Sequence, residues 1–125
     1  MIPEAAKVAE DLKWLYDSLD PLDKGNVSGL IDQLDYANQW LVRCSTLLAD
    51  AQAINDLARS KASEKYGEDT TPTRLNIALN GDCAEERKLL LLAERLSALL
   101  VHRIDSIRTL ISLEKQMAGN ELRGR

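Results

Sequence analysis

Apolar residues recur every three or four positions along most of this chain, which is the spacing of one face of an α-helix. The longest such stretch predicts a helix over residues 28–66, with Ser28 as its N-cap and Gly67 at its end. Its apolar positions alternate by four and three, as in a heptad repeat, so we expect the helix to supercoil against a neighbour. The positions of this repeat, one of which is the polar Asn55, are Leu30, Leu34, Ala37, Leu41, Cys44, Leu48, Ala51, Asn55, Ala58 and Ala62.

A second long pattern predicts a helix over residues 83–118. Asp82 and Glu85 have the spacing of a capping box, and Gly119 is placed to end the helix. We expect residues 119–125 to form a loose basic tail. The predicted buried face contains Leu89, Leu92, Ala93, Leu96, Leu99, Leu100, Ile104, Ile107, Leu110 and Ile111.

Two shorter helices are expected around these. The first, over residues 3–19, carries an apolar stripe and ends before Asp20-Pro21. The other, over residues 72–79, starts after a Thr71 cap with Pro72 in its first turn, and Asn80-Gly81 follows it as a turn.

The prediction is therefore an all-α, coiled-coil-like antiparallel hairpin, with the shorter N-terminal helix packed along part of it, in a single domain of residues 1–125. The N-terminal helix is too short to cover the hairpin, so we expect a homo-oligomer, with a dimer favoured. The residues expected at the interface or fixing its register are Leu34, Leu41, Leu48, Asn55, Arg103, Glu114, Leu90 and Val101.

Three of these residues are polar. Asn55, Arg103 and Glu114 fall within apolar faces, so each is expected to find a hydrogen-bond or ion-pair partner. A buried polar residue of this kind can fix the register of a coiled coil. The alternative for Arg103 is that its guanidinium extends to solvent at the helix edge.

Composition agrees with packed helices. The chain is 45% hydrophobic and 29% charged and lacks Phe, so it is typical of a folded domain and not of a disordered one. Its net charge of −4 disfavours a general nucleic-acid binder. No apolar run is long enough to span a bilayer, and we expect a cytoplasmic protein with Cys44 and Cys83 reduced. A disulfide or a reactive Cys83 is the alternative.

Residues suited to catalysis are sparse. His102, the only histidine, and Asp105 could share a helix face, but one such pair is at most half of a di-metal site. The carboxylates of a metal-dependent nucleotide hydrolase would be Asp32, Asp35, Glu86 and Glu94, and the two pairs are expected at opposite ends of the hairpin. We therefore expect no metal and no cofactor.

Basic residues follow the last long helix without forming one stripe, and acidic residues lie among them, so a nucleic-acid track is disfavoured. The basic residues are Arg87, Lys88, Arg95, Arg103, Arg108, Lys115, Arg123 and Arg125.

One stretch carries a resemblance. The segments Ala93-Glu94-Arg95-Leu96, His102-Arg103-Ile104-Asp105, Ile107-Arg108 and Leu110-Ile111-Ser112 resemble the last helix of small uncharacterised helical proteins of bacterial prophages and mobile elements. This resemblance covers about thirty residues and implies no activity, cofactor or catalytic residue. It implies an accessory or assembly protein.

The leading hypothesis is a non-catalytic helical interaction or assembly protein that binds through exposed helix faces, to a second copy or to another protein. The alternatives are an all-α metal-dependent nucleotide hydrolase, and a nucleic-acid accessory factor that uses the last helix and the basic tail.

Overall fold

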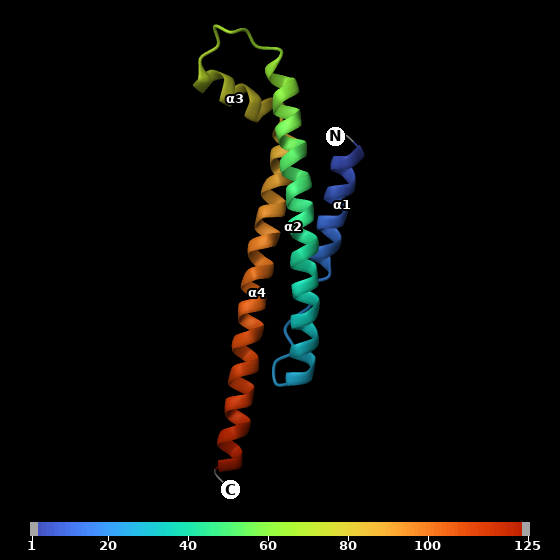
Figure 1. Ribbon diagram of the computed structural model, residues 1–125, viewed down its shortest axis with the longest axis vertical. Coiled ribbons are helices and arrows are strands. Elements are labelled where there is room, and N and C mark those ends of the chain that lie inside the picture. The colour runs from blue at the N-terminus through green and yellow to red at the C-terminus, as the bar shows by residue number, and fades with distance from the viewer. Residues whose placement is uncertain (1–2, 124–125) are drawn as a thin grey trace.

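The computed structural model describes the backbone of residues 3–123 and the side chains of residues 4–120. Within this range the chain forms α-helices and no strand, which confirms the all-α fold. In chain order they are α1 (Pro3–Asp17), α2 (Val27–Ser63), α3 (Pro72–Asp82) and α4 (Ala84–Arg123) (Figure 1).

The two longest helices, α2 and α4, run antiparallel along each other as the predicted hairpin (Figure 1). Leu30 and Ala37, near the start of α2, pack against Ile104 and Ile107 of α4. Farther along, Cys44 and Ala51 of α2 pack against the first half of α4. Because small side chains recur on the α2 seam, the two helices can approach closely over most of its length.

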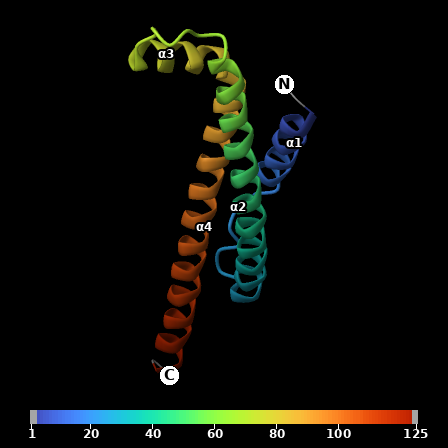
Figure 2. The same cartoon turned by 45° about the horizontal axis from the view of Figure 1, so that its top comes forward.

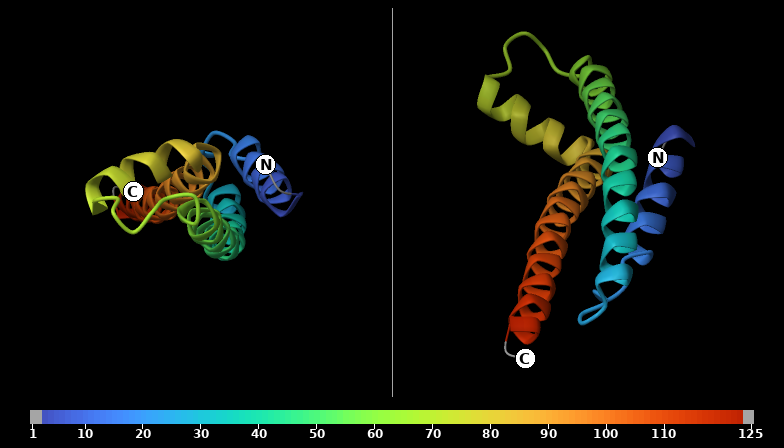
Figure 3. Two further views of the ribbon diagram at one scale, coloured as in Figure 1. Left: turned by 90° about the horizontal axis from the view of Figure 1, so that it is seen from above. Right: turned by 60° about the horizontal axis from the view of Figure 1, so that its bottom comes forward.

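The shorter helix α1 packs against both α2 and the first half of α4, and it runs in the same direction as α4 (Figures 1 and 3). Its buried stripe enters the largest core cluster, where Leu12 is fully buried. Burying a leucine side chain contributes about 1.5–3 kcal/mol. The stripe consists of Ala5, Val8, Leu12 and Leu15.

An ion-pair network also ties α1 to α2. The Asp11 carboxylate accepts from Lys7 Nζ at 3.0 Å and from Arg43 Nη2 of α2 at 2.9 Å. The hydrogen bond from Lys7 is the main reason why the pKa of Asp11 lies below its ordinary value. Because these side chains are accessible to water, the network orients α1 more than it stabilises the fold.

The helix α3 projects from the top of the hairpin, on the side away from α1 (Figures 2 and 3). Leu79 and Cys83 pack against Ala62 of α2. Arg59 of α2 donates to the side-chain oxygens of Asn80 at 2.9 Å and Asn76 at 2.8 Å. These contacts fix the direction in which α3 leaves the hairpin.

Several predicted helix ends are wrong. The N-cap of α2 is Asn26, whose side chain accepts from the Gly29 amide, and α2 ends at Ser63. Asn80 and Gly81 lie inside α3, and Asp82 is the last residue of α3 instead of a cap for α4. Thr71 caps α3, as predicted.

The two terminal helices also differ from their predicted lengths. The helix α1 ends at Asp17, and α4 continues through Gly119 to Arg123, where a loose tail was expected. Arg125, the last residue of that expected tail, lies outside the described residues. No helix in the described part of the chain is both long and apolar enough to cross a membrane.

Candidate functional site

Large apolar side chains remain exposed on one face of α4. They are Leu92, Leu99, Leu113 and Met117, with exposed fractions of 41%, 40%, 48% and 57%. Positions 92, 99, 106 and 113 are seven apart, and Met117 is four residues beyond the last, so they follow one face of a heptad repeat. We call these four residues the α4 stripe. Ser106, which is half-buried, occupies the seventh-residue position between Leu99 and Leu113.

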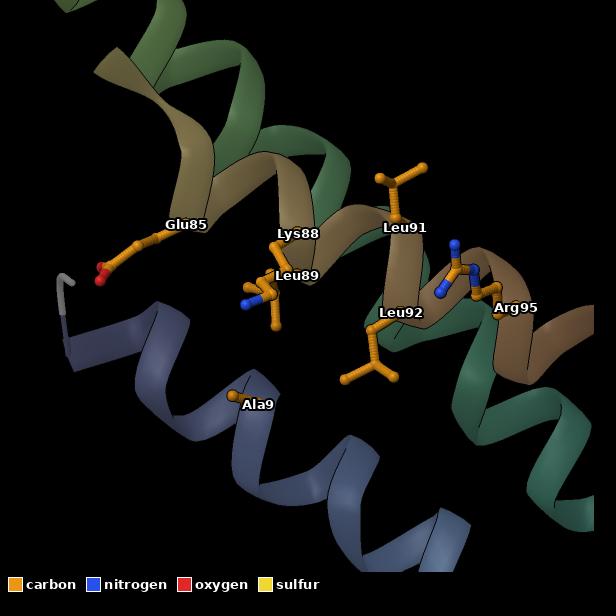
Figure 4. A pocket seen from close by; sticks show the side chains of 7 residues that line it. All are labelled: Ala9, Glu85, Lys88, Leu89, Leu91, Leu92 and Arg95. Carbon is orange, nitrogen blue, oxygen red and sulfur yellow. The ribbon is translucent and has the colours of Figure 1, made fainter. Parts of the chain in front are cut away.

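The upper part of the α4 stripe borders a groove between α1 and α4, with a volume of about 670 Å³. We call it the α1–α4 groove. In Figure 4, Leu92 of α4 points toward α1 and Leu91 points away from it. Its lining residues are Ala9, Glu85, Lys88, Leu89, Leu91, Leu92 and Arg95. Its floor is therefore apolar, and charged side chains line the rest.

The lower part of the α4 stripe lies on the C-terminal part of α4, which extends beyond α2. Ile111 is the last residue of α4 in the hydrophobic cluster at the start of α2, and Figure 1 shows α4 projecting beyond the start of α2. From Ser112 to Asn120 no described side chain is buried. We call residues 112–123 the α4 overhang; at 1.5 Å per residue it is about 18 Å long.

The sequence placed Leu92 and Leu99 on the buried face, and this is wrong, since both are exposed. Leucine is favoured on either face of a heptad helix, so the pattern cannot tell a covered leucine from an uncovered one. The spacing of the leucines could nevertheless have indicated an exposed row. Leu92, Leu99 and Leu113 lie seven residues apart or a multiple of seven, beside the seam that contains Leu89 and Leu96.

The aliphatic residues predicted for an interface differ in how far they are buried within the chain. Leu34, Leu41 and Leu48 are half-buried and pack within the chain's own hydrophobic clusters. Leu90 is only 9% exposed and belongs to the main core, which leaves little of it for a partner. Val101 is 46% exposed on α4.

The polar residues predicted for the interface also differ in their burial and in their hydrogen bonds. Arg103 donates from Nη2 to the backbone carbonyl of Asp20, in the segment after α1, while its buried Nε has no hydrogen-bond partner among the described residues. Burial lowers the pKa of this guanidinium, and Asp20 opposes that shift. Asn55 is 8% exposed, and its Oδ1 is unpaired within the described chain. Glu114 is half-buried.

The carboxylates considered for a metal site do not converge. Asp32 and Asp35 lie near the start of α2, whereas Glu86 and Glu94 lie in the first half of α4, at the other end of the hairpin. Among the described residues no group of three or more His, Cys, Asp or Glu side chains is placed to hold a metal ion. His102 and Asp105 are both exposed on α4.

The cysteines are buried and free of disulfides. The Cys44 Sγ lies 3.7 Å from the Ala93 carbonyl oxygen, within the core. Burial raises the pKa of both thiols, and for Cys83 the nearby Glu86 carboxylate raises it further. A raised pKa disfavours the nucleophilic thiolate, which argues against the reactive Cys83 of the alternative hypothesis.

Comparisons with protein-family models, with curated proteins and with solved structures found no match for this chain.

Proposed function

We propose that this protein is a non-catalytic helical interaction or assembly protein that binds another helix through the α4 stripe. The observation that carries the proposal is the exposure of Leu92, Leu99, Leu113 and Met117 along one face of one helix. Scattered exposed leucines are common on protein surfaces, whereas an ordered row of them is typical of a binding surface.

The charge and shape of this surface suit a protein helix. The row has a seven-residue spacing, so its side chains lie along one face of α4, where a partner helix can pack lengthwise. Its partner is a second copy of the chain or another protein. The basic residues of α4 lie on several faces of the helix, so a phosphate backbone would meet no continuous positive track.

Two further parts of the proposal rest on the sequence. The setting in a prophage or mobile element rests on the resemblance of segments in residues 93–112. A cytoplasmic location is supported by Cys44 and Cys83, which are both free thiols, because disulfides are rare in reducing compartments.

The experiment compares two double variants of the full chain. Leu99→Glu with Leu113→Glu places two charges in the α4 stripe. Val42→Glu with Leu57→Glu places the same charges on exposed apolar positions of α2, where the exposed fractions are 70% and 51%. Both variants should keep wild-type helicity by circular dichroism, because none of the four side chains is buried.

Association is then measured in two ways: with the chain's own copies by light scattering, and with other proteins by quantitative pull-down. We expect the stripe variant to bind at least about tenfold more weakly than wild type, a loss of 1.4 kcal/mol or more, and the α2 variant to bind normally. Equal binding by the two variants, or no association of the wild-type chain in either assay, would refute the proposal.

A further inference from the structure

The two central leucines of the α4 stripe, Leu99 and Leu113, are placed symmetrically about Ser106. Leu99 and Leu113 each lie seven residues from it, so two antiparallel copies of α4 that cross at Ser106 place each Leu99 opposite the other copy's Leu113. We propose that the partner of the α4 stripe is a second copy of this chain, packed antiparallel across a two-fold axis at Ser106. This proposal rests on the proposed function and names its partner.

The same axis brings the α4 overhang of one copy next to the α1–α4 groove of the other. It lays the second copy's residues 112–120 against residues 92–100 of the first, beside the α1–α4 groove. Met117 of the second copy comes opposite Arg95, between Leu92 and Leu99. Each copy has one α4 overhang and one α1–α4 groove, so the two contacts are equivalent and the dimer is closed.

The overhang gives an independent reason for a partner on this face. A few helical turns without tertiary contacts are only marginally stable in water, because packing of an apolar face supplies most of the stability of a helix. Leu113 and Met117 provide that face and are about half exposed in the single chain. Residues 92–100 of the second copy would cover them.

Charge favours the antiparallel arrangement over the parallel one. Lys88 and Arg95 lie seven residues apart beside the α4 stripe. In a parallel pair they would face their own equivalents, and like charges would oppose association. In the antiparallel pair Glu114 of the second copy comes opposite Ala98, within one helical turn of the positively charged Arg95.

The contact is long enough to be specific. From Leu92 to Met117 the α4 stripe covers between three and four heptads, about 38 Å of helix. The stripe supplies an apolar residue in each of these heptads except the one at Ser106, so the contact extends over several turns of both helices. Ser106 at the crossing point is small, which allows the two backbones to approach closely there.

Cross-linking tests the position of the axis. In the full chain carrying Ser106→Cys, the two new thiols face each other at the two-fold axis and should form an intermolecular disulfide under mild oxidation. The matched control is Asp105→Cys, whose exposed thiol lies next along the helix and points to another face. The wild-type chain supplies the background, since Cys44 and Cys83 are buried.

Charge pairing tests the orientation. In the antiparallel dimer, Leu99→Lys with Leu113→Glu forms two Lys–Glu pairs, whereas Leu99→Glu with Leu113→Glu forms two repulsive pairs. In a parallel dimer both variants place like charges together. We expect the Lys–Glu variant to dimerise at least tenfold more tightly than the Glu–Glu variant in sedimentation equilibrium.

The outcomes separate this inference from the proposed function. A wild-type chain that stays monomeric at roughly 100 µM would refute the second copy as the partner. If another protein then bound through the α4 stripe, the proposed function would still hold. A dimer that cross-links no faster through Ser106→Cys than through Asp105→Cys, and shows no preference for the Lys–Glu variant, also overturns the inference. Fast cross-linking together with that preference supports it.

Discussion

At the scale of single residues, Asn55 is the clearest departure from expectation. It was predicted to find a partner because a buried polar group without one costs free energy. Its side chain is 8% exposed, yet Oδ1 accepts no hydrogen bond from the described residues. The expectation is wrong for this atom, and the fold tolerates the cost of one unpaired acceptor.

Replacing this residue should therefore stabilise the protein. We expect Asn55→Leu, which is similar in size, to raise the free energy of unfolding by about 1 kcal/mol, since an unsatisfied buried group costs about 1–3 kcal/mol. Asn38→Leu, at an exposed position of the same helix, should change it by less than about 0.5 kcal/mol. Urea denaturation measures both. A clear loss of stability in Asn55→Leu would show that the amide has a partner that matters.

At the scale of elements, the start of α2 shows how local geometry selects a cap. Asn26 has an extended backbone, and its Oδ1 accepts from the Gly29 amide at 3.1 Å. Its Nδ2 also donates to Asp23 at 3.1 Å. Ser28, the cap expected from the sequence, lies within the first turn of the helix.

This assignment predicts unequal effects of two alanine substitutions. Asn26→Ala should lower the free energy of unfolding by about 1 kcal/mol, because it leaves a helix-terminal amide without an acceptor. Ser28→Ala should be close to neutral, since alanine suits a helical position. Thermal denaturation of the two variants measures the difference. A larger loss of stability in Ser28→Ala than in Asn26→Ala would show that Ser28 is the N-cap.

Much of the element layout could be predicted from the sequence, for a physical reason. Burial of an apolar face drives helix formation, and heptad spacing over tens of residues is a strong sequence signal for such a face. Helix ends are weaker signals. A glycine inside a helix costs only about 1 kcal/mol, so Gly81 and Gly119 do not stop helices whose neighbouring residues favour them.

The candidate site was harder to predict than the fold. The sequence predicts Leu90 and Val101 at an interface and Leu92 and Leu99 on the buried face, but the structure buries Leu90 and leaves Leu92 and Leu99 exposed. Which leucine is covered depends on where the short α1 docks and where α2 begins. Those are long-range properties, and no periodicity within α4 records them.

At the scale of the whole molecule, the unequal lengths of the helices decide which surfaces remain open. The helix α1 packs on the middle of α2 and the first half of α4, and the cluster at the start of α2 includes no residue of α4 beyond Ile111. The core clusters therefore support α4 from Leu89 to Ile111 and include no described residue of the α4 overhang. Local stability should fall from one part of the same helix to the other.

Amide hydrogen exchange should show this division and its dependence on concentration. In dilute, monomeric protein we expect amides of residues 112–120 to exchange at least about tenfold faster than those of residues 93–107, because packing protects only the latter. At concentrations that favour the dimer, residues 112–120 should become protected as the second copy covers them. The Leu113→Glu variant should stay unprotected there at every concentration. Protection of residues 112–120 that is independent of both concentration and this substitution would mean that the chain stabilises its own α4 overhang.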